Sequence, residues 1–336
     1  MPEIWRKNRL YAFLRPYVDL CTRFSYSSVE IRGSLPKDGA VIISPNHTNT
    51  LMDALVVLMS RRDRTVFASR ADIFRKPKIA RILRFLKMLP LARSRDTVEE
   101  IAHTREILHE IDGVLASGVP FCIFSEGTHR PKHSLQPIRK GIARIAMDSA
   151  EKRQTWIVPA GIEYSDWFHY RGTAKLTYGA PIDVNAIMAA HPELQGKDLY
   201  PVIQDELYRR MSELILFFPD DENYDKAFAE YEASLPRKKR WPKLLLAALT
   251  SPLFLLSAIL SLPMWLAAEI ICRKIKDKAF CNTARFGARL VGTPLMILLW
   301  GLLLGFLFPW WIWVPIIAWF FHSYSFFYDW LNLIRH

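Results

Sequence analysis

Residues 40–58, AVIISPNHTNTLMDALVVL, join two apolar runs through a mostly polar stretch. The first run has the length and β-branched content of a buried strand, and the second has helical spacing. Between the runs lie His47 and, six residues further on, Asp53. The pattern predicts that His47 lies in a loop where a strand of an α/β fold passes into a helix.

A histidine in such a loop is a candidate general base. Its unperturbed pKa lies nearest neutrality, and a loop at the end of a buried strand is open to a ligand. A carboxylate such as Asp53 can accept the Nδ1 proton, fix the tautomer and leave Nε2 to take a proton. Short His–Asp pairs also occur at helix N-termini without any catalytic role, so a second motif must decide between the two interpretations.

That second motif lies in residues 119–130, VPFCIFSEGTHR, where another apolar strand runs into a turn. Gly127 would let the backbone approach a ligand, Thr128 offers a hydroxyl, and Arg130 can bind phosphate oxygens in a bidentate fork. Further basic residues follow, namely Lys132, His133, Arg139 and Lys140. A phosphate site and a solvated basic loop are the two interpretations of this turn.

Taken together, the two stretches resemble the glycerol-phosphate and lysophosphatidate acyltransferase family, in which four motifs follow one another in fixed order. The first family motif is Asn-His followed, after four residues, by Asp. Here Asn46, His47 and Asp53 match it, with five residues between His and Asp. The third, Phe-Pro-Glu-Gly-Thr-Arg, is matched by residues 124–128 with His129 inserted before Arg130.

The other two motifs are shorter. The second, an arginine after an apolar segment, is matched within residues 89–95 by Arg93 or Arg95. The fourth, a Val-Pro segment on a strand, is matched within residues 157–161 at Pro159.

Two departures from the family pattern affect the assignments. The extra residue between His47 and Asp53 prevents both from lying on one regular helical face, so the loop must absorb the difference. The insertion leaves two candidates for the family arginine position, His129 and Arg130. Arg130 is favoured, because only a guanidinium is charged at every working pH.

The resemblance implies an enzyme that moves an acyl group from acyl-coenzyme A or acyl carrier protein to glycerol 3-phosphate or lysophosphatidate in phospholipid synthesis. It implies His47 as base, Asp53 as its orienting carboxylate, no metal and no cofactor beyond the co-substrate. The predicted substrate-binding residues are Asn46, Arg70, Arg93, Arg95, Glu126, Gly127, Thr128, Arg130, Lys140 and Pro159. The alternative is a membrane-tethered lipid-binding or scaffold protein that keeps this fold without catalysis.

Strands expected near 29–32, 40–44, 65–69, 119–125, 155–162 and 174–178 alternate with helices expected near 51–60, 74–88, 97–113 and 137–150. This alternation predicts an α/β fold, a mixed sheet flanked by helices, with its ligand site off the strand ends. His47, Arg70, Glu126 and Pro159 are all expected near such ends. The predicted regions are an amphipathic N-terminal helix (1–28), a glycerolphosphate acyltransferase-like catalytic domain (29–184), a helical extension (185–236), and a basic collar with an all-helical membrane region (237–336).

The N-terminal region interleaves aromatic and basic residues, which fits a helix at the lipid interface or a helix packed on the catalytic domain, broken or kinked at Pro16. Its lack of an uninterrupted apolar core argues against a secretory signal peptide. The chain has 45 Lys+Arg against 33 Asp+Glu, a net charge of +12. That excess suits an anionic partner, and beside membrane segments anionic lipid headgroups are preferred to nucleic acid. Four cysteines without metal-type spacing indicate a reducing compartment.

The apolar segments 244–271 and 290–319 each exceed the ~20 residues that cross a bilayer. Basic residues precede the first segment at 237–243 and separate the two at 273–289. Both basic groups stay on the cytoplasmic side if each segment bends back at a proline, at Pro252 or Pro263 and at Pro309. A conventional two-span hairpin is the alternative. Either way, the expectation is an integral membrane protein with its catalytic domain at the cytoplasmic face.

Overall fold

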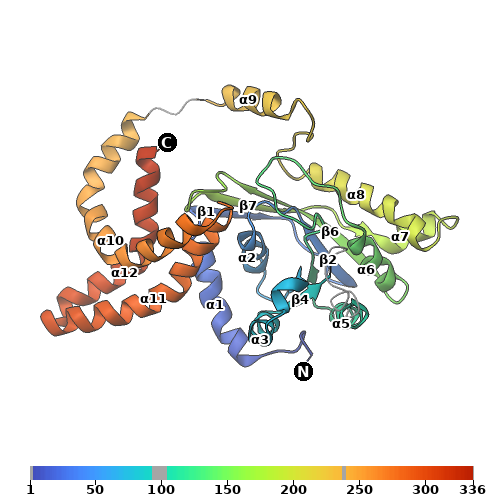
Figure 1. The fold of residues 1–336 in the computed structure, drawn as a ribbon, viewed down its shortest axis with the longest axis horizontal. Coiled ribbons are helices and arrows are strands. Elements are labelled where there is room, and N and C mark those ends of the chain that lie inside the picture. The colour runs from blue at the N-terminus through green and yellow to red at the C-terminus, as the bar shows by residue number, and fades with distance from the viewer. Residues whose placement is uncertain (1–2, 93–103, 237–239, 336) are drawn as a thin grey trace.

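The computed structural model describes residues 3–92, 104–236 and 240–335, and its centre is a mixed sheet that the described residues build from eight strands (Figure 1). The strands are β1 (Ser28–Arg32), β2 (Ala40–Pro45), β3 (Val66–Arg70), β4 (Met88–Leu91), β5 (Phe121–Cys122), β6 (Thr155–Tyr164), β7 (Thr173–Tyr178) and β8 (Ile182–Asp183). Their order is β1-β7-β6-β2-β5-β3-β4, and β8 pairs with β6. The predicted mixed sheet is therefore confirmed.

Parallel pairing dominates the half of the sheet that carries the two motifs. β2 is parallel to both β5 and β6, and β3 is parallel to β5 and β4. Only β7 and β8 run antiparallel to β6. The carboxyl ends of β2, β3, β4, β5 and β6 consequently meet at one edge, which is where an open α/β sheet binds its ligands.

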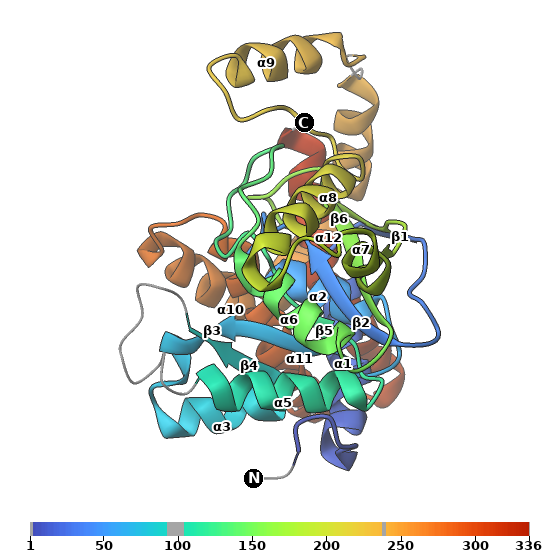
Figure 2. The same cartoon turned by 90° about the vertical axis from the view of Figure 1, so that its right-hand side faces the viewer.

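Helices cover both faces of the sheet. In the α/β part they are α1 (Arg9–Arg23), α2 (Leu51–Met59), α3 (Pro77–Phe85), α5 (Thr104–Ala116), α6 (Lys140–Ala150), α7 (Val184–Ala190), α8 (Tyr200–Ser212) and α9 (Tyr224–Ser234), with single 3-10 turns η1 (Ala71–Phe74) and η2 (Gly196–Leu199). The C-terminal part consists of α10 (Trp241–Lys274), α11 (Phe280–Leu307) and α12 (Trp310–Arg335). Figure 2 shows α5, α6, α7 and α8 in front of the sheet.

Strand β2 shows why the sheet needs helices on both sides. All six of its residues are buried. Ile42 joins the core under α5, α6 and α8, whereas Val41 and Ile43 join the core under α1 and α2. Alternate side chains of a strand point to opposite faces, so an uninterrupted apolar run is buried only between two helical layers.

Helix α1 packs on the α/β part of the chain. The Arg15 guanidinium is buried and donates to the carbonyl oxygens of Leu58, at the end of α2, and of Arg61, just after it. The opposite face keeps apolar side chains exposed, with Phe13 78% exposed and Leu10 57%. The helix runs through Pro16 without interruption, so the expected break there is absent. One face of α1 therefore packs on the rest of the domain, and the other face carries exposed apolar side chains.

The first apolar segment does not bend back at a proline. α10 is continuous through Pro252 and Pro263, which corrects the expected return. The second segment does turn where expected, because α11 ends at Leu307 and α12 begins at Trp310, on either side of Pro309. Pro309 directly precedes α12, a position where a helix tolerates proline.

Two shorter elements also differ from expectation. Residues 88–91 form strand β4 at the sheet edge, where a helix through residue 88 was expected. Helix α6 begins at Lys140 rather than near 137. Part of the helix expected near 97–113 lies outside the described residues. The regional boundaries after residues 28, 184 and 236 stay predictions.

Candidate active site

The register of the sheet brings the two motifs to one level. Ile42 of β2 pairs with Phe121 of β5 on one side and Ile157 of β6 on the other. His47 follows Ile42, and Glu126 follows Phe121, by the same number of residues. Both loops therefore leave the carboxyl edge side by side, and the Arg130 amide donates to the His47 carbonyl oxygen at 2.9 Å.

The predicted base and carboxylate form a hydrogen-bonded pair. His47 Nδ1 lies 2.7 Å from Asp53 Oδ2, and Asp53 is fully buried. The same oxygen accepts the amides of Thr48 and Asn49 at 2.9 and 2.8 Å. The other oxygen accepts the Tyr164 hydroxyl at 2.8 Å. A carboxylate that accepts from four donors is held in one position, so it orients the His47 ring and favours the tautomer with the proton on Nδ1.

The loop absorbs the extra residue of the motif at its last position. Thr50 has φ 51°, in the left-handed region that a β-branched residue rarely adopts, and helix α2 begins at the next residue. Asn46 secures the other end, because its amide exchanges two hydrogen bonds with the Ile162 backbone, at 3.0 and 2.6 Å. Both amide atoms of Asn46 are thus engaged, so the structure places this residue as a loop anchor rather than a substrate ligand.

The His47 side chain is 18% exposed, with its ring stacked on Phe124 at 4.3 Å between centroids. The inserted His129 lies edge-on to it at 5.7 Å. Among the described residues no hydrogen bond engages His47 Nε2. The nitrogen that a general base needs is therefore available to a substrate hydroxyl.

Glu126 connects the two loops. It is buried, and its oxygens accept the His47 and Gln136 amides, both at 2.8 Å. Burial raises the pKa of Glu126 from 4.5 to about 7, while hydrogen bonds from these two amides act in the opposite direction. Since both oxygens are used by backbone donors, Glu126 positions the loops and is not placed to bind substrate directly.

The turn after Glu126 depends on glycine. Gly127 has φ 77°, and the Arg139 side chain lies against the position that a Cβ would occupy. Next to it, the Thr128 hydroxyl donates to Gln136 Oε1 at 2.9 Å. The glycine thus permits the turn, while Thr128 is held by an internal hydrogen bond.

Arg130 and His129 point to different partners. The Arg130 guanidinium contacts Asp220 and donates to Ser134 Oγ at 2.8 Å, and Lys132 shares Asp220 at 2.7 Å. His129 Nε2 instead lies 2.6 Å from Asp277 Oδ2, in the turn between α10 and α11. The two cations beside Asp220 form the group best suited to an anionic ligand, whereas His129 faces the C-terminal helices.

The remaining predicted site residues are spread more widely. Arg70 ends β3 and pairs with Asp72. Lys140 is exposed at the first turn of α6. Pro159 is buried inside β6, which continues to Tyr164, so it is not at the end of its own strand. It pairs with Ser44, one residue before the end of β2. Arg93 and Arg95 lie outside the described residues.

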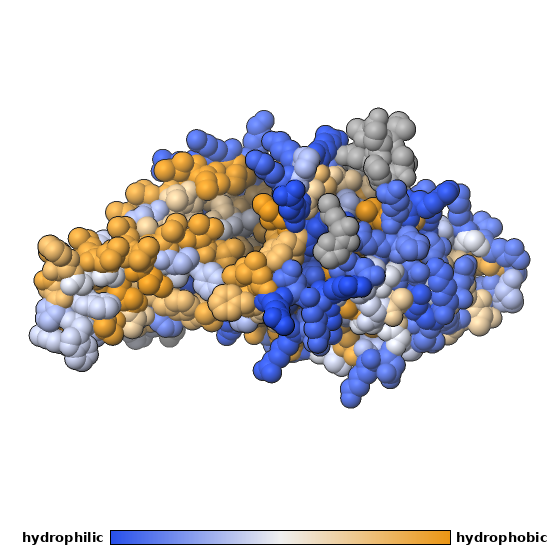
Figure 3. Space-filling view, turned by 90° about the horizontal axis from the view of Figure 1, so that it is seen from below, coloured by the Kyte–Doolittle hydropathy of each residue, from blue (hydrophilic) through white to orange (hydrophobic). Residues whose placement is uncertain are grey.

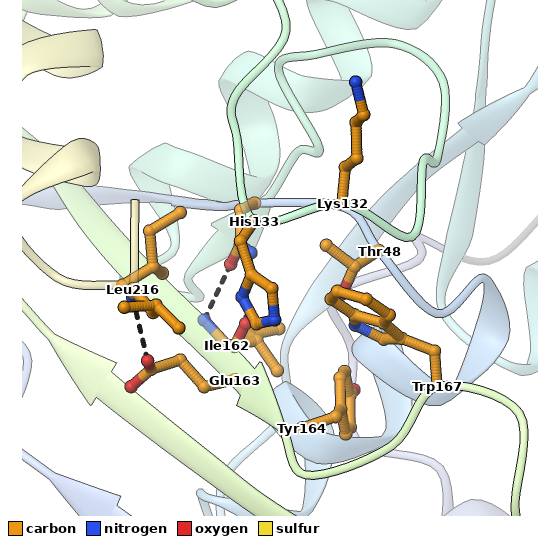
Figure 4. A pocket seen from close by; sticks show the side chains of 10 residues that line it. Thr48, Lys132, His133, Ile162, Glu163, Tyr164, Trp167 and Leu216 are labelled. Atoms are coloured by element: carbon orange, nitrogen blue, oxygen red, sulfur yellow. Dashed lines mark hydrogen bonds between the residues drawn. The ribbon is translucent and has the colours of Figure 1, made fainter. Parts of the chain in front are cut away.

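Beside the loop that carries His47 is a small, partly open hollow, with room for about one water molecule. Figure 4 shows Thr48, His133 and Trp167 around it, above the end of β6, with the Lys132 side chain at its rim pointing away. The Thr48 hydroxyl is buried without a hydrogen-bond partner in the part of the chain that the structure describes. A polar atom left unpaired costs free energy, so a water molecule or one polar group of a ligand in this hollow would offset that cost.

Several site residues were missed by sequence reasoning, namely Tyr164, Gln136, Asp220 and Asp277. Tyr164 had a weak signal, since it is a polar aromatic residue at the end of an apolar strand. The others had none, because each lies far along the chain from the residue it contacts or in a loop without pattern. In the described ranges, no three His, Cys, Asp or Glu side chains are grouped closely enough to hold a metal ion.

The chain is similar to one protein family and to a solved structure. Residues 28–163, which contain both loops of the candidate site, match the model of the family described as Acyltransferase. A solved structure, the 1-acyl-sn-glycerophosphate (LPA) acyltransferase PlsC from Thermotoga maritima, is 20% identical, with a TM-score of 0.43 over 63% of this chain and 85% of that chain. No curated protein matches this chain.

Proposed function

We propose that this protein is a membrane-bound O-acyltransferase that acylates a hydroxyl of glycerol 3-phosphate or lysophosphatidate, using a thioester of coenzyme A or acyl carrier protein. The observation that carries the proposal is the His47–Asp53 pair, with a fully buried carboxylate and an Nε2 that forms no hydrogen bond with the described residues. The match of residues 28–163 to an acyltransferase family supports the reaction class.

In the proposed reaction His47 Nε2 takes the proton of the acceptor hydroxyl as its oxygen attacks the thioester carbonyl. A carbon–oxygen bond forms, the carbon–sulfur bond breaks, and the proton passes from His47 to the departing sulfur. Asp53 keeps Nδ1 protonated and stabilises the imidazolium that exists between the two proton transfers. Because the four donors to Asp53 are already in place, no reorganisation is needed at that moment.

The acceptor phosphate requires cations near the same loops. Arg130 and Lys132 both form ion pairs with the partly exposed Asp220. A phosphate with two negative charges can bind to these cations beside that carboxylate or in its place. Phosphate favours guanidinium because of bidentate geometry. These contacts lie away from the reacting carbon and contribute by positioning, which can supply several kcal/mol of the barrier reduction.

The membrane part of the proposal depends on the C-terminal helices. α10 and α11 are long and apolar enough to cross a membrane. Of the most apolar 18-residue stretch of each helix, only 22% in α10 and 6% in α11 is buried. Figure 3 shows apolar surface concentrated on these helices and hydrophilic surface over much of the α/β part. A lipid acceptor would reach a domain held at the bilayer without being extracted into water, which costs about 0.8 kcal/mol per CH₂.

The α11–α12 hairpin suits entry into the bilayer from one side. The buried residues of α11 lie between Cys281 and Thr293, and those of α12 between Phe320 and Tyr328. Phe306 and Trp310 at the tip are 89% and 70% exposed. The free part of α11, from Pro294 to Leu307, has a length of about 21 Å, shorter than the ~30 Å hydrocarbon core. We place this hairpin within the bilayer and the catalytic domain on its cytoplasmic face, against anionic headgroups.

The test is an acyl-transfer assay of the purified protein in detergent and in anionic vesicles. Glycerol 3-phosphate and lysophosphatidate are each offered with acyl-coenzyme A and with acyl carrier protein. Ester formation with at least one pair is expected, and the pair identifies donor and acceptor. Binding of vesicles without transfer to either acceptor would refute the proposal and favour a lipid-binding scaffold with a degenerate acyltransferase fold.

A further inference from the structure

The turn between α10 and α11 reaches both catalytic loops. Asp277 in this turn binds His129, and the ring of Phe280 at the start of α11 lies edge-on to His129 at 5.3 Å. One turn further on, Thr283 Oγ1 lies 3.1 Å from Thr50 Oγ1. The helices proposed to enter the membrane therefore contact the loop after β2 and the loop after β5 within a few residues of each other.

His129 is the inserted residue that departs from the family motif. Its ring lies edge-on to His47, and the next residue, Arg130, hydrogen-bonds to the His47 carbonyl oxygen. Its predecessor, Thr128, is hydrogen-bonded to Gln136. A side chain in the middle of this loop can fix the loop only if something outside the loop holds the side chain, and Asp277 does so.

The turn itself is well anchored. Asp277 Oδ1 accepts the Ala279 amide at 3.0 Å, which leaves Oδ2 for His129. In the first turns of α11, Asn282 donates to the Trp167 carbonyl oxygen at 2.8 Å. The hydrogen bond from His129 lowers the pKa of Asp277 below its ordinary value of 3.8, so the carboxylate is charged at neutral pH. The contact joins a rigid helix start to a catalytic loop.

We propose that Asp277 is a positioning residue for acyl transfer, which holds His129 and with it the Thr128–Arg130 loop, so that the C-terminal helices complete the active site as well as anchoring it. The inference rests on the proposed function. It assigns a role to the inserted His129 and predicts that a change between two membrane helices alters how the enzyme binds a water-soluble acceptor.

The kinetic experiment uses full-length protein in detergent with glycerol 3-phosphate, so that membrane access is not limiting. Asp277→Ala and His129→Ala should each raise KM for this acceptor about 10-fold, with a smaller fall in kcat, because a displaced loop costs binding geometry. The double variant should be no worse than either single variant, as expected for residues that act through one contact. Asp277→Glu should restore part of the loss, and Lys276→Ala, an exposed neighbour in the same turn, is the control.

Hydrogen exchange provides a readout that does not depend on activity. In Asp277→Ala, amides of residues 124–133 should exchange faster than in the parent, and Lys276→Ala should leave them unchanged. A parent without acyl transfer would refute the proposed function only. Unchanged exchange at 124–133 in Asp277→Ala, or losses that add in the double variant, would overturn the positioning role of Asp277 whatever the activity.

Discussion

The two loops of the candidate active site are held in different ways. The loop of residues 46–53 is fixed from within, because its own Asp53 binds His47 and the amides of Thr48 and Asn49. In the loop of residues 126–130 the side chains of His129 and Arg130 are held from outside, by Asp277 and Asp220, which lie 148 and 90 residues further along the chain. The comparison teaches that the base is a local feature of the chain, whereas the surface proposed to hold the acceptor depends on the whole fold.

The first loop can be tested by removing its base. His47→Ala should reduce kcat by about 10²–10⁴-fold, as is typical for loss of a general base, with the protein still folded. The matched control is His169→Ala, since His169 Nδ1 also pairs with an aspartate, Asp166, at 2.6 Å but is not placed as a base. Activity of His47→Ala near that of the parent would refute the mechanism.

Glu126, which connects the two loops, should make the stability of the folded protein depend on pH. Because burial raises the pKa of Glu126 from 4.5 to about 7, the folded protein binds a proton at Glu126 more tightly than the unfolded chain does. The resulting stabilisation is complete below pH ~4.5 and is lost as the pH rises through ~7, by up to about 3 kcal/mol.

Thermal unfolding of the parent and of Glu126→Gln in detergent, from pH 4.5 to 8, measures this effect. The uncharged glutamine cannot titrate, so the stability of the parent relative to the variant should fall as the pH rises. A constant difference in Tm over this range would show that Glu126 does not titrate in the folded protein as predicted.

A smaller change tests how rigidly Asp53 is held. Tyr164→Phe removes one of four donors to the Asp53 carboxylate, which should cost about 2 kcal/mol of stability and lower kcat less than His47→Ala does. Tyr178→Phe is the control. Tyr178 lies in β7 of the same sheet, and its hydroxyl forms a hydrogen bond with Ser60 rather than with Asp53. Equal effects of the two variants on kcat would mean that Tyr164 does not support the pair.

The smallest expected effect lies in the second loop. Arg130→Ala should raise KM for a phosphorylated acceptor about 10-fold, equivalent to ~1.4 kcal/mol, through loss of a charged hydrogen-bond donor. KM for the acyl donor should change little. Steady-state kinetics with each substrate varied in turn decides this, with Arg209→Ala in an exposed ion pair as control. A rise in donor KM instead would assign this loop to the thioester.

Much of the fold follows from patterns in the chain. The apolar run at 40–45 predicts a doubly covered strand, and the polar stretch after it predicts the loop that carries His47. The length of β6 was harder to predict, because the end of a strand depends on its neighbours; β6 extends to Tyr164 as it pairs with β7. That extension brings Tyr164 to Asp53.

By itself the sequence determined the strand-to-helix loops, the His47–Asp53 pair and the apolar character of the C-terminal segment, because each depends on residues close together in the chain. Only the tertiary structure decided which groups meet those loops. Asn46 and Glu126 form hydrogen bonds with backbone groups, Arg130 binds Asp220, and His129 binds Asp277. The physical reason is that side-chain partners are selected by proximity in the folded chain, and residues from distant segments come together only when sheet register and helix packing place them there.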